Sequence, residues 1–178
     1  DIIRTVVISL SALLFTACST TSALPEGEQL FTGLKPIKYT DYVPGDHAEN
    51  TKTEIESVLA STPNGALFGS SYYRSPIQFN LWVWNAFSRS TTPLSRWIVR
   101  TFGTKPKLMS EVNPALRVSV AENHLRKYGY FNNHVSAQEI VGSNPKKAKI
   151  AYTVSLGHLW TFDSIEYVGF PHHADSLI

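Results

Sequence analysis

Hydrophobic and polar residues alternate most strictly over residues 147–156. On one side of an extended strand the side chains are apolar, namely Ala148, Ile150, Tyr152, Val154 and Leu156. On the other side most are polar or charged, namely Lys147, Lys149, Thr153 and Ser155. Residues 133–141 also have the composition of a strand, and a turn-forming stretch, 142–146, separates the two runs. The pattern predicts an antiparallel hairpin with one buried face.

A helical pattern precedes this hairpin over residues 113–129. Asn113 suits the N-cap and Pro114 the first helical position, while Gly129 suits the left-handed conformation that ends many helices. Apolar residues recur at helical spacing along it, namely Leu116, Val120, Ala121, Leu125 and Tyr128. The pattern predicts an amphipathic helix.

The N-terminal half of the folded region has a weaker pattern. Residues 29–40 favour a strand, in which Pro36 makes an edge position or an irregular start. Residues 50–60 predict a short helix with Ile55, Val58 and Leu59 on one face and with Asn50 or Thr51 as its cap.

Residues 62–108 differ from the rest and are interpreted as an insertion. The segment is rich in aromatic residues, and Thr92 and Pro93 predict the start of a small amphipathic helix that stops at Gly103. No acidic residue lies between Glu56 and Glu111, although the chain as a whole carries a formal charge of only +2. A basic, tryptophan-rich helix can lie in a membrane interface or bind a ligand. The candidate contacts are Trp82, Trp84, Trp97, Arg96 and Arg100. The alternative is that the aromatics fill the packing of the insertion and the arginines solvate its outside.

Composition narrows the class of protein. With 43% apolar and 17% charged residues the chain is typical of a folded protein. Residues 5–15 form an apolar block that is too short to span a bilayer and has the length of a secretory signal, so residues 1–17 are predicted to be a signal peptide. Cys18 is the single cysteine, which excludes an intramolecular disulfide and disfavours a structural zinc site.

The residues before Cys18 resemble a bacterial lipoprotein signal, because Thr16, Ala17 and Cys18 match its lipobox, whereas Phe15 departs from it. The resemblance implies cleavage before Cys18 and lipidation of its sulfur and new amino terminus. Residues 18–28 would then be a lipidated, flexible tether. The alternative is a buried core cysteine that follows an ordinary cleaved signal.

The predicted order is strand, two helices and hairpin, and it is accompanied by residues 125–131 (LRKYGYF), Val135, residues 150–154, Gly157 and residues 165–169. This combination resembles a POTRA domain, the periplasmic module of the Omp85 outer-membrane assembly proteins. Residues 162–167 also repeat the apolar-x-x-Ile-charged-Tyr pattern of residues 34–39. The expected fold is α+β, in the order β-α-α-β-β, with a small mixed sheet covered by two helices. Its first POTRA-like domain would span residues 29–158, with the insertion at 62–108, and residues 159–178 would start a second.

Together with the lipobox, the chain resembles the N-terminal region of the translocation and assembly module lipoproteins of Bacteroidota, which are lipid-anchored relatives of the TamA-type proteins. These continue through further POTRA units into a membrane β-barrel, so no insertase activity is expected within residues 1–178. The resemblance implies a non-enzymatic arm, anchored in the outer membrane and facing the periplasm, that binds unfolded outer-membrane protein clients or a TamB-like protein. No cofactor, metal or nucleic acid is expected.

Binding is expected through β-augmentation, in which an extended segment adds to an exposed edge strand. Residues 133–141 are the candidate edge, with His134, Ser136, Gln138 and Glu139 as its polar side chains, and a proline at Gln138 would test it. The alternative is an edge that polar side chains merely protect.

A different class of function remains open at this point. A surface lipoprotein that binds glycan or lipid would use an aromatic platform, namely Tyr72, Tyr73, Trp82, Trp84 and Trp97. An enzyme has the least support, because His124 borders an apolar stripe, and no cluster of acidic or thiol residues accompanies His172 and His173 in the sequence.

Overall fold

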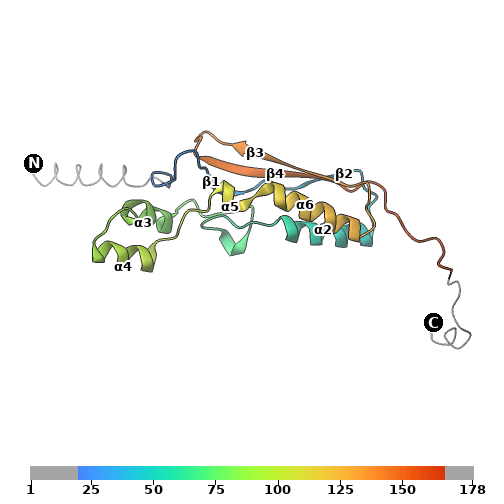
Figure 1. Cartoon of the computed structure of the whole chain (residues 1–178), viewed down its shortest axis with the longest axis horizontal. Coiled ribbons are helices and arrows are strands. Elements are labelled where there is room, and N and C mark those ends of the chain that lie inside the picture. Colours follow the sequence, from blue (N-terminus) through green and yellow to red (C-terminus); the bar gives the residue numbers. More distant parts are fainter. Residues whose placement is uncertain (1–19, 167–178) are drawn as a thin grey trace, which may run out of the picture.

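A computed structural model describes residues 20–166, which form an α+β fold. The elements in chain order are β1 (Leu30–Leu34), β2 (Lys38–Thr40), α2 (Asp46–Leu59), the 3-10 helix η1 (Leu67–Gly69), α3 (Phe79–Phe87), α4 (Pro93–Phe102), α5 (Met109–Val112), α6 (Pro114–Lys127), β3 (His134–Val141) and β4 (Lys147–Ser155). Figure 1 shows α2 and α6 along one face of the sheet, with α3 and α4 at the end of the molecule near the described N-terminal residues.

Strand β4 is the centre of a small mixed sheet. It pairs in parallel with β1 through its first half and with β2 through its second half. Strand β3 pairs with β4 in antiparallel register from His134 against Ser155 to Val141 against Ala148. The predicted hairpin is therefore confirmed. The single strand predicted over residues 29–40 is wrong in one respect, because residues 35–37, which include Pro36, separate it into β1 and β2.

The core lies between the sheet and the two long helices. The alternation predicted for β4 is confirmed, because its alternate residues from Ala148 to Leu156 are all buried. Ile55 and Leu59 of α2 and Ala121 and Leu125 of α6 pack in the same core. The opposite face of β4 carries half-exposed residues, and Figure 1 shows no helix over it within the described part of the chain.

Helix α2 begins four residues before the predicted start. Its N-cap is Gly45, which makes no side-chain capping bond, and Asp46 and Glu49 lie in the first turn, where negative charge complements the helix dipole. The predicted caps are therefore wrong. Thr51 lies inside the helix and donates its hydroxyl to the carbonyl oxygen of His47 at 2.7 Å.

Both predicted ends of α6 are confirmed. Asn113 accepts the N–H of Leu116 at 3.2 Å, and Gly129 has a φ of 87°. The predicted apolar stripe is partly wrong, because Leu116 is 59% exposed and Val120 is 44% exposed. The helix rests on the core along a line through Ala121 and Leu125, and Leu116 and Val120 lie on a neighbouring side.

The insertion has a helix start that agrees with its sequence. Thr92 caps α4 by accepting the N–H of Ser95 at 3.3 Å, and Pro93 takes the first helical position. Helix α4 ends at Phe102, and Gly103 is its C-cap. The short helix α5 was not predicted, although Met109 and Val112 contribute to the core.

The expected tether is packed in the part that the structure describes. Thr21 and Leu24 are buried, and Leu24 clusters with Leu30, Leu81 and Leu108. A flexible tether is therefore not found over these residues, because apolar side chains of α3 and β1 offer Leu24 a buried site. Cys18 and the predicted signal peptide lie outside the described residues, as do His172 and His173.

The predicted start of a second POTRA unit is only partly within the described residues. Residues 161–166 are exposed and form no strand, and the repeated motif ends at Tyr167, outside the described range. Trp160 is held against the end of α6, since its N–H donates to the carbonyl oxygen of Gly129 at 2.9 Å.

Candidate functional site

Strand β3 lies at the edge of the sheet. It pairs with β4 on one side, and no other strand of the described chain pairs with it. The opposite edge differs, because backbone bonds from Phe31 to Lys107 and from Leu34 to Ser71 cover β1. An uncovered strand edge carries backbone donors and acceptors that can pair with another extended segment.

Two hydrogen bonds show which residues of β3 point their backbone groups outward. The N–H of Val135 donates to Glu122 on α6, whereas the N–H of Gly142 donates to Lys147 at the start of β4. The register is continuous between them, so the backbone groups alternate along the strand. Ala137 and Glu139 therefore share the outward orientation of Val135, and Ser136 and Gln138 bond to β4.

This alternation shows that a proline at Gln138 does not test the free edge of β3. The N–H of Gln138 belongs to the ladder with β4, so a proline at Gln138 would break the hairpin rather than only the free edge. The N–H groups of Ala137 and Glu139 face outward, and a proline is tolerated best where the N–H faces solvent.

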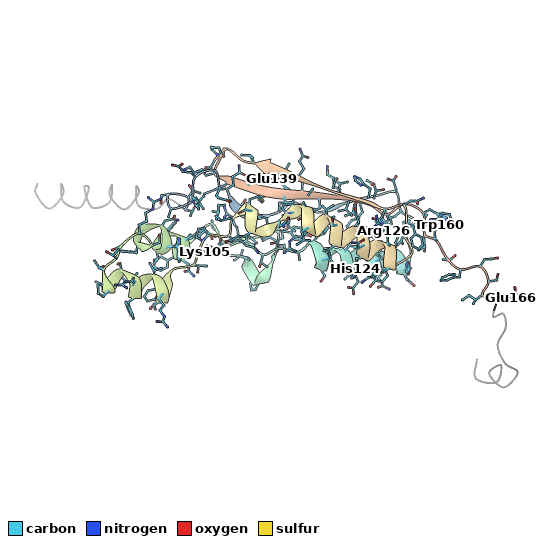
Figure 2. The ribbon with its side chains drawn as sticks, in the orientation of Figure 1. Lys105, His124, Arg126, Glu139, Trp160 and Glu166 are labelled. Carbon is cyan, nitrogen blue, oxygen red and sulfur yellow. The ribbon has the colours of Figure 1, made fainter. Side chains whose placement is uncertain are left out.

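The four predicted polar residues divide between the two faces of the sheet. Ser136 and Gln138 are on the open face, because they alternate with the buried Val135, whereas the His134 ring reaches the strand edge beside Glu122. Glu139 shares the face of Val135, toward the helices, and it is exposed. Figure 2 shows Glu139 on β3, well separated from His124 on α6.

A groove runs beside the outward edge of β3. It has a volume of about 410 Å³ and lies between the first turns of α6 and the strand. Pro114, Ala115 and Val118 line it from the helix, and residues 135–139 line it from the strand. An extended segment paired with β3 could place alternate side chains in this groove.

Glu122 limits the free edge at its N-terminal end. Its Oε1 accepts the Val135 N–H at 3.1 Å and lies 3.4 Å from Nδ1 of His134. The side chain of Asn133 donates to the backbone oxygen of Glu122 at 3.3 Å, which holds the start of β3 against α6. The available edge therefore begins after Val135.

The second group of predicted site residues lies on α3 and α4. Trp97 is 58% exposed on α4, and Arg96 and Arg100 beside it are exposed. Trp82 and Trp84 on α3 are half-buried, and the indole N–H of Trp82 has no hydrogen-bond partner in the described chain.

The five aromatics of the alternative glycan or lipid platform are in different environments. Tyr72 packs against the main core, and Tyr73 is exposed in the loop before α3. The ring contact found for Trp97 is with Phe102, at 6.0 Å between centroids. No ring contact joins any two of the five within the described residues.

The histidines of the described chain lie mainly near the C-terminal end of α6. His124 is half-buried, with its ring centroid 5.6 Å from that of Tyr128. His47 stacks on Tyr130 at 5.8 Å and bonds to the backbone oxygen of Tyr128 at 2.9 Å. Over residues 20–166, no group of three or more His, Cys, Asp or Glu side chains is arranged to hold a metal.

Burial shifts the pKa of two basic groups within the insertion. Desolvation lowers the pKa of Arg74, and it is also the main cause that lowers the pKa of Lys107. The Lys107 ammonium donates to the hydroxyl of Ser61 at 3.0 Å and to the carbonyl oxygen of Thr62 at 2.9 Å. The ammonium of Lys107 is therefore bonded within the protein, and Nη1 of Arg74 is buried.

Sequence reasoning missed two parts of the site at β3. Glu122 was not singled out, because nothing in the helical pattern shows that its carboxylate meets a strand 13 residues later. The groove was missed because Pro114 was interpreted only as the first helical position, and Ala115 was given no role. The sequence offered one signal for this site, namely that Glu122 is a polar residue at the edge of the helix that faces the hairpin.

Comparisons with protein-family models, curated proteins and solved structures find no match to this chain. Within the described residues, no helix combines the length and apolarity that crossing a membrane requires.

Proposed function

We propose that this chain is a lipid-anchored, non-enzymatic module of outer-membrane protein assembly, which binds extended segments at the outward edge of β3. It would be a POTRA-type unit of a translocation and assembly module lipoprotein, held in the outer membrane through Cys18 and facing the periplasm. Its ligands would be unfolded outer-membrane clients or a TamB-like protein.

The observation that carries the proposal is the free edge of β3 beside an apolar groove. The backbone N–H and C=O groups of Ala137 and Glu139 face away from β4, and Val118 and Ala115 line the adjacent groove. Main-chain hydrogen bonds would supply affinity, and alternate side chains in the groove would supply selectivity. Strands of outer-membrane barrels alternate apolar and polar residues, which suits such a site.

The order of the elements also supports the proposal. With residues 62–108 set aside, the chain has two short strands, β1 and β2, then α2, the four-residue α5 and α6, and a hairpin whose second strand is central. This order is compatible with the expected β-α-α-β-β order if β1 and β2 are taken as one interrupted strand and α5 is set aside.

A matched pair of variants at Glu139 tests the proposal. Glu139→Pro removes an outward N–H, whereas Glu139→Ala removes the side chain and keeps the N–H. The ligand is a fluorescent peptide of about ten alternating apolar and polar residues, the pattern of a barrel strand. We expect Glu139→Ala to bind within twofold of the parent chain and Glu139→Pro to bind about tenfold more weakly, the effect of one hydrogen bond.

Fluorescence anisotropy gives the affinities, and circular dichroism checks that both variants keep the fold. Equal affinity of two folded variants would rule out docking at this edge. Ala137→Pro and Ala137→Ser form a second pair at the neighbouring outward position, for use if Glu139→Pro does not fold.

A further inference from the structure

Helix α4 exposes apolar residues that its own fold does not cover. Leu94 is 67% exposed and Trp97 is 58% exposed, and their spacing of three places them on one side of the helix. The side that faces the protein is marked instead by Ser95, which is buried and bonded to Ser90 and Thr92. The packing of the insertion therefore leaves Leu94 and Trp97 at the surface.

Exposed arginines accompany this apolar surface. Arg96 and Arg100 lie one turn apart on α4, and neither guanidinium group forms a hydrogen bond or ion pair with another residue of the described chain. Two other cations of the insertion are engaged, because Lys105 forms an ion pair with Glu111 at 2.6 Å and Lys107 donates to Ser61. No acidic residue lies in the insertion to neutralise Arg96 and Arg100.

The first described residues of the chain are fixed beside α3, the partner of α4. The N–H of Ala23 donates to Asn85 at 2.8 Å, and Arg89 donates to the carbonyl oxygen of Ser22 at 3.3 Å. Figure 1 shows these residues at the same end of the molecule as α3 and α4. Two residues of chain span at most about 7 Å, so an anchor at Cys18 would place the membrane close to Thr20.

We propose that the α3–α4 hairpin, residues 79–102, docks on the surface of an anionic lipid bilayer. Leu94 and Trp97 enter the interface between headgroups and acyl chains, and Arg96 and Arg100 contact anionic headgroups. The hairpin thereby gives the anchored chain a second contact with the membrane and fixes its orientation. This inference uses the lipid anchor of the proposed function but does not require strand docking at β3.

Tryptophan quenching by brominated lipids tests the proposal on the whole chain. One variant keeps Trp97 as its single tryptophan through Trp82→Phe, Trp84→Phe and Trp160→Phe. Its matched control keeps Trp160 through Trp82→Phe, Trp84→Phe and Trp97→Phe. Trp160 is a close control, because it is 53% exposed and lies at the opposite end of the molecule, as Figure 2 shows.

The probe is a vesicle of phosphatidylcholine and phosphatidylglycerol with brominated acyl chains, compared with a vesicle of phosphatidylcholine alone. We expect at least twofold stronger quenching of Trp97 than of Trp160 on the anionic vesicles. Arg96→Gln with Arg100→Gln should lower the ratio of docked to undocked hairpin about 30-fold, since each cation near an anionic surface contributes roughly fivefold. Arg126→Gln with Lys127→Gln, at the far end of α6, should leave this ratio unchanged.

Equal quenching of Trp97 and Trp160 would overturn the proposal. Quenching of Trp97 that is the same on anionic and on phosphatidylcholine vesicles would also overturn it. If the triple variants do not fold, the single variants decide. Trp97→Phe should then abolish most of the quenching and Trp160→Phe little of it, and the reverse result refutes membrane docking. Peptide binding at β3 is measured separately, so a failure here leaves the strand proposal standing.

Discussion

Glu122 and Val135 connect α6 to the edge of the sheet, through a 3.1 Å hydrogen bond from the Val135 N–H to the Glu122 carboxylate. The bond satisfies the first outward donor of β3, and it shows by its direction which residues of the strand face outward. It also positions β3 against α6, so this one contact helps to shape both the groove and the free edge.

Glu122→Ala should destabilise the fold, because it leaves the Val135 N–H without its carboxylate. We expect the free energy of unfolding to fall by about 1 kcal/mol, since water can partly replace a bond at a sheet edge. Glu122→Gln keeps an acceptor oxygen and should lose less. Urea denaturation compares the two, and equal losses would mean that the carboxylate does not hold the strand.

Gly129 ends α6 in a conformation that other residues adopt with strain. Its φ is 87°, and a Cβ at this position would lie 2.7 Å from the backbone oxygen of Trp160. Gly129→Ala should therefore lower the free energy of unfolding by about 2 kcal/mol or more, of which the left-handed conformation accounts for about 1–2 kcal/mol.

Gly142→Ala is the control for this prediction, because a Cβ at Gly142 meets no atom within 4 Å. It should change the stability by less than about 0.5 kcal/mol. Thermal unfolding measures both variants. If Gly129→Ala were as stable as Gly142→Ala, the backbone of residues 159–160 would not restrict the side chain at the end of α6.

The ion pair of Glu111 predicts a dependence of stability on pH. Glu111 accepts from Lys105 at 2.6 Å and from the Leu108 N–H at 3.3 Å, and these two bonds lower the pKa of its carboxyl. A carboxyl with a lower pKa in the folded state contributes stability above its unfolded pKa, and this contribution is lost as the pH falls through the folded value.

Below about pH 4, the usual range of a glutamate, the free energy of unfolding of Glu111→Gln should therefore fall less steeply with falling pH than that of the parent chain. Its effect at neutral pH should be small, because the pair is exposed. Glu54→Gln on the exposed side of α2 provides the comparison. Identical pH profiles of the two variants, measured by denaturation, would argue against the Glu111 contribution.

Local signals predicted the hairpin and the ends of α6 well. The strict alternation before Leu156 reflects one buried face, and Asn113, Pro114 and Gly129 act through neighbouring backbone groups. These features depend on a few adjacent residues, so they can be predicted from the local sequence.

Features that depend on distant contacts were predicted less well. Leu116 and Val120 fit a helical stripe, yet the contact with α2 and the sheet selects a different side of α6. Leu24 lies in a stretch of small polar residues and is buried because α3 and β1 lie beside it. The candidate edge was located on the correct strand, but the direction of each N–H depends on the register with β4.

Residue-resolved hydrogen exchange on the β3 amides, with and without the barrel-strand peptide, tests strand docking most directly. In the free chain the amides of Ser136 and Gln138 should exchange slowly, because they bond to β4, and those of Ala137 and Glu139 should exchange fast. Bound peptide should slow Ala137 and Glu139 and leave Ser136 and Gln138 unchanged. Saturating peptide that leaves Ala137 and Glu139 as fast as in the free chain would contradict docking at this edge.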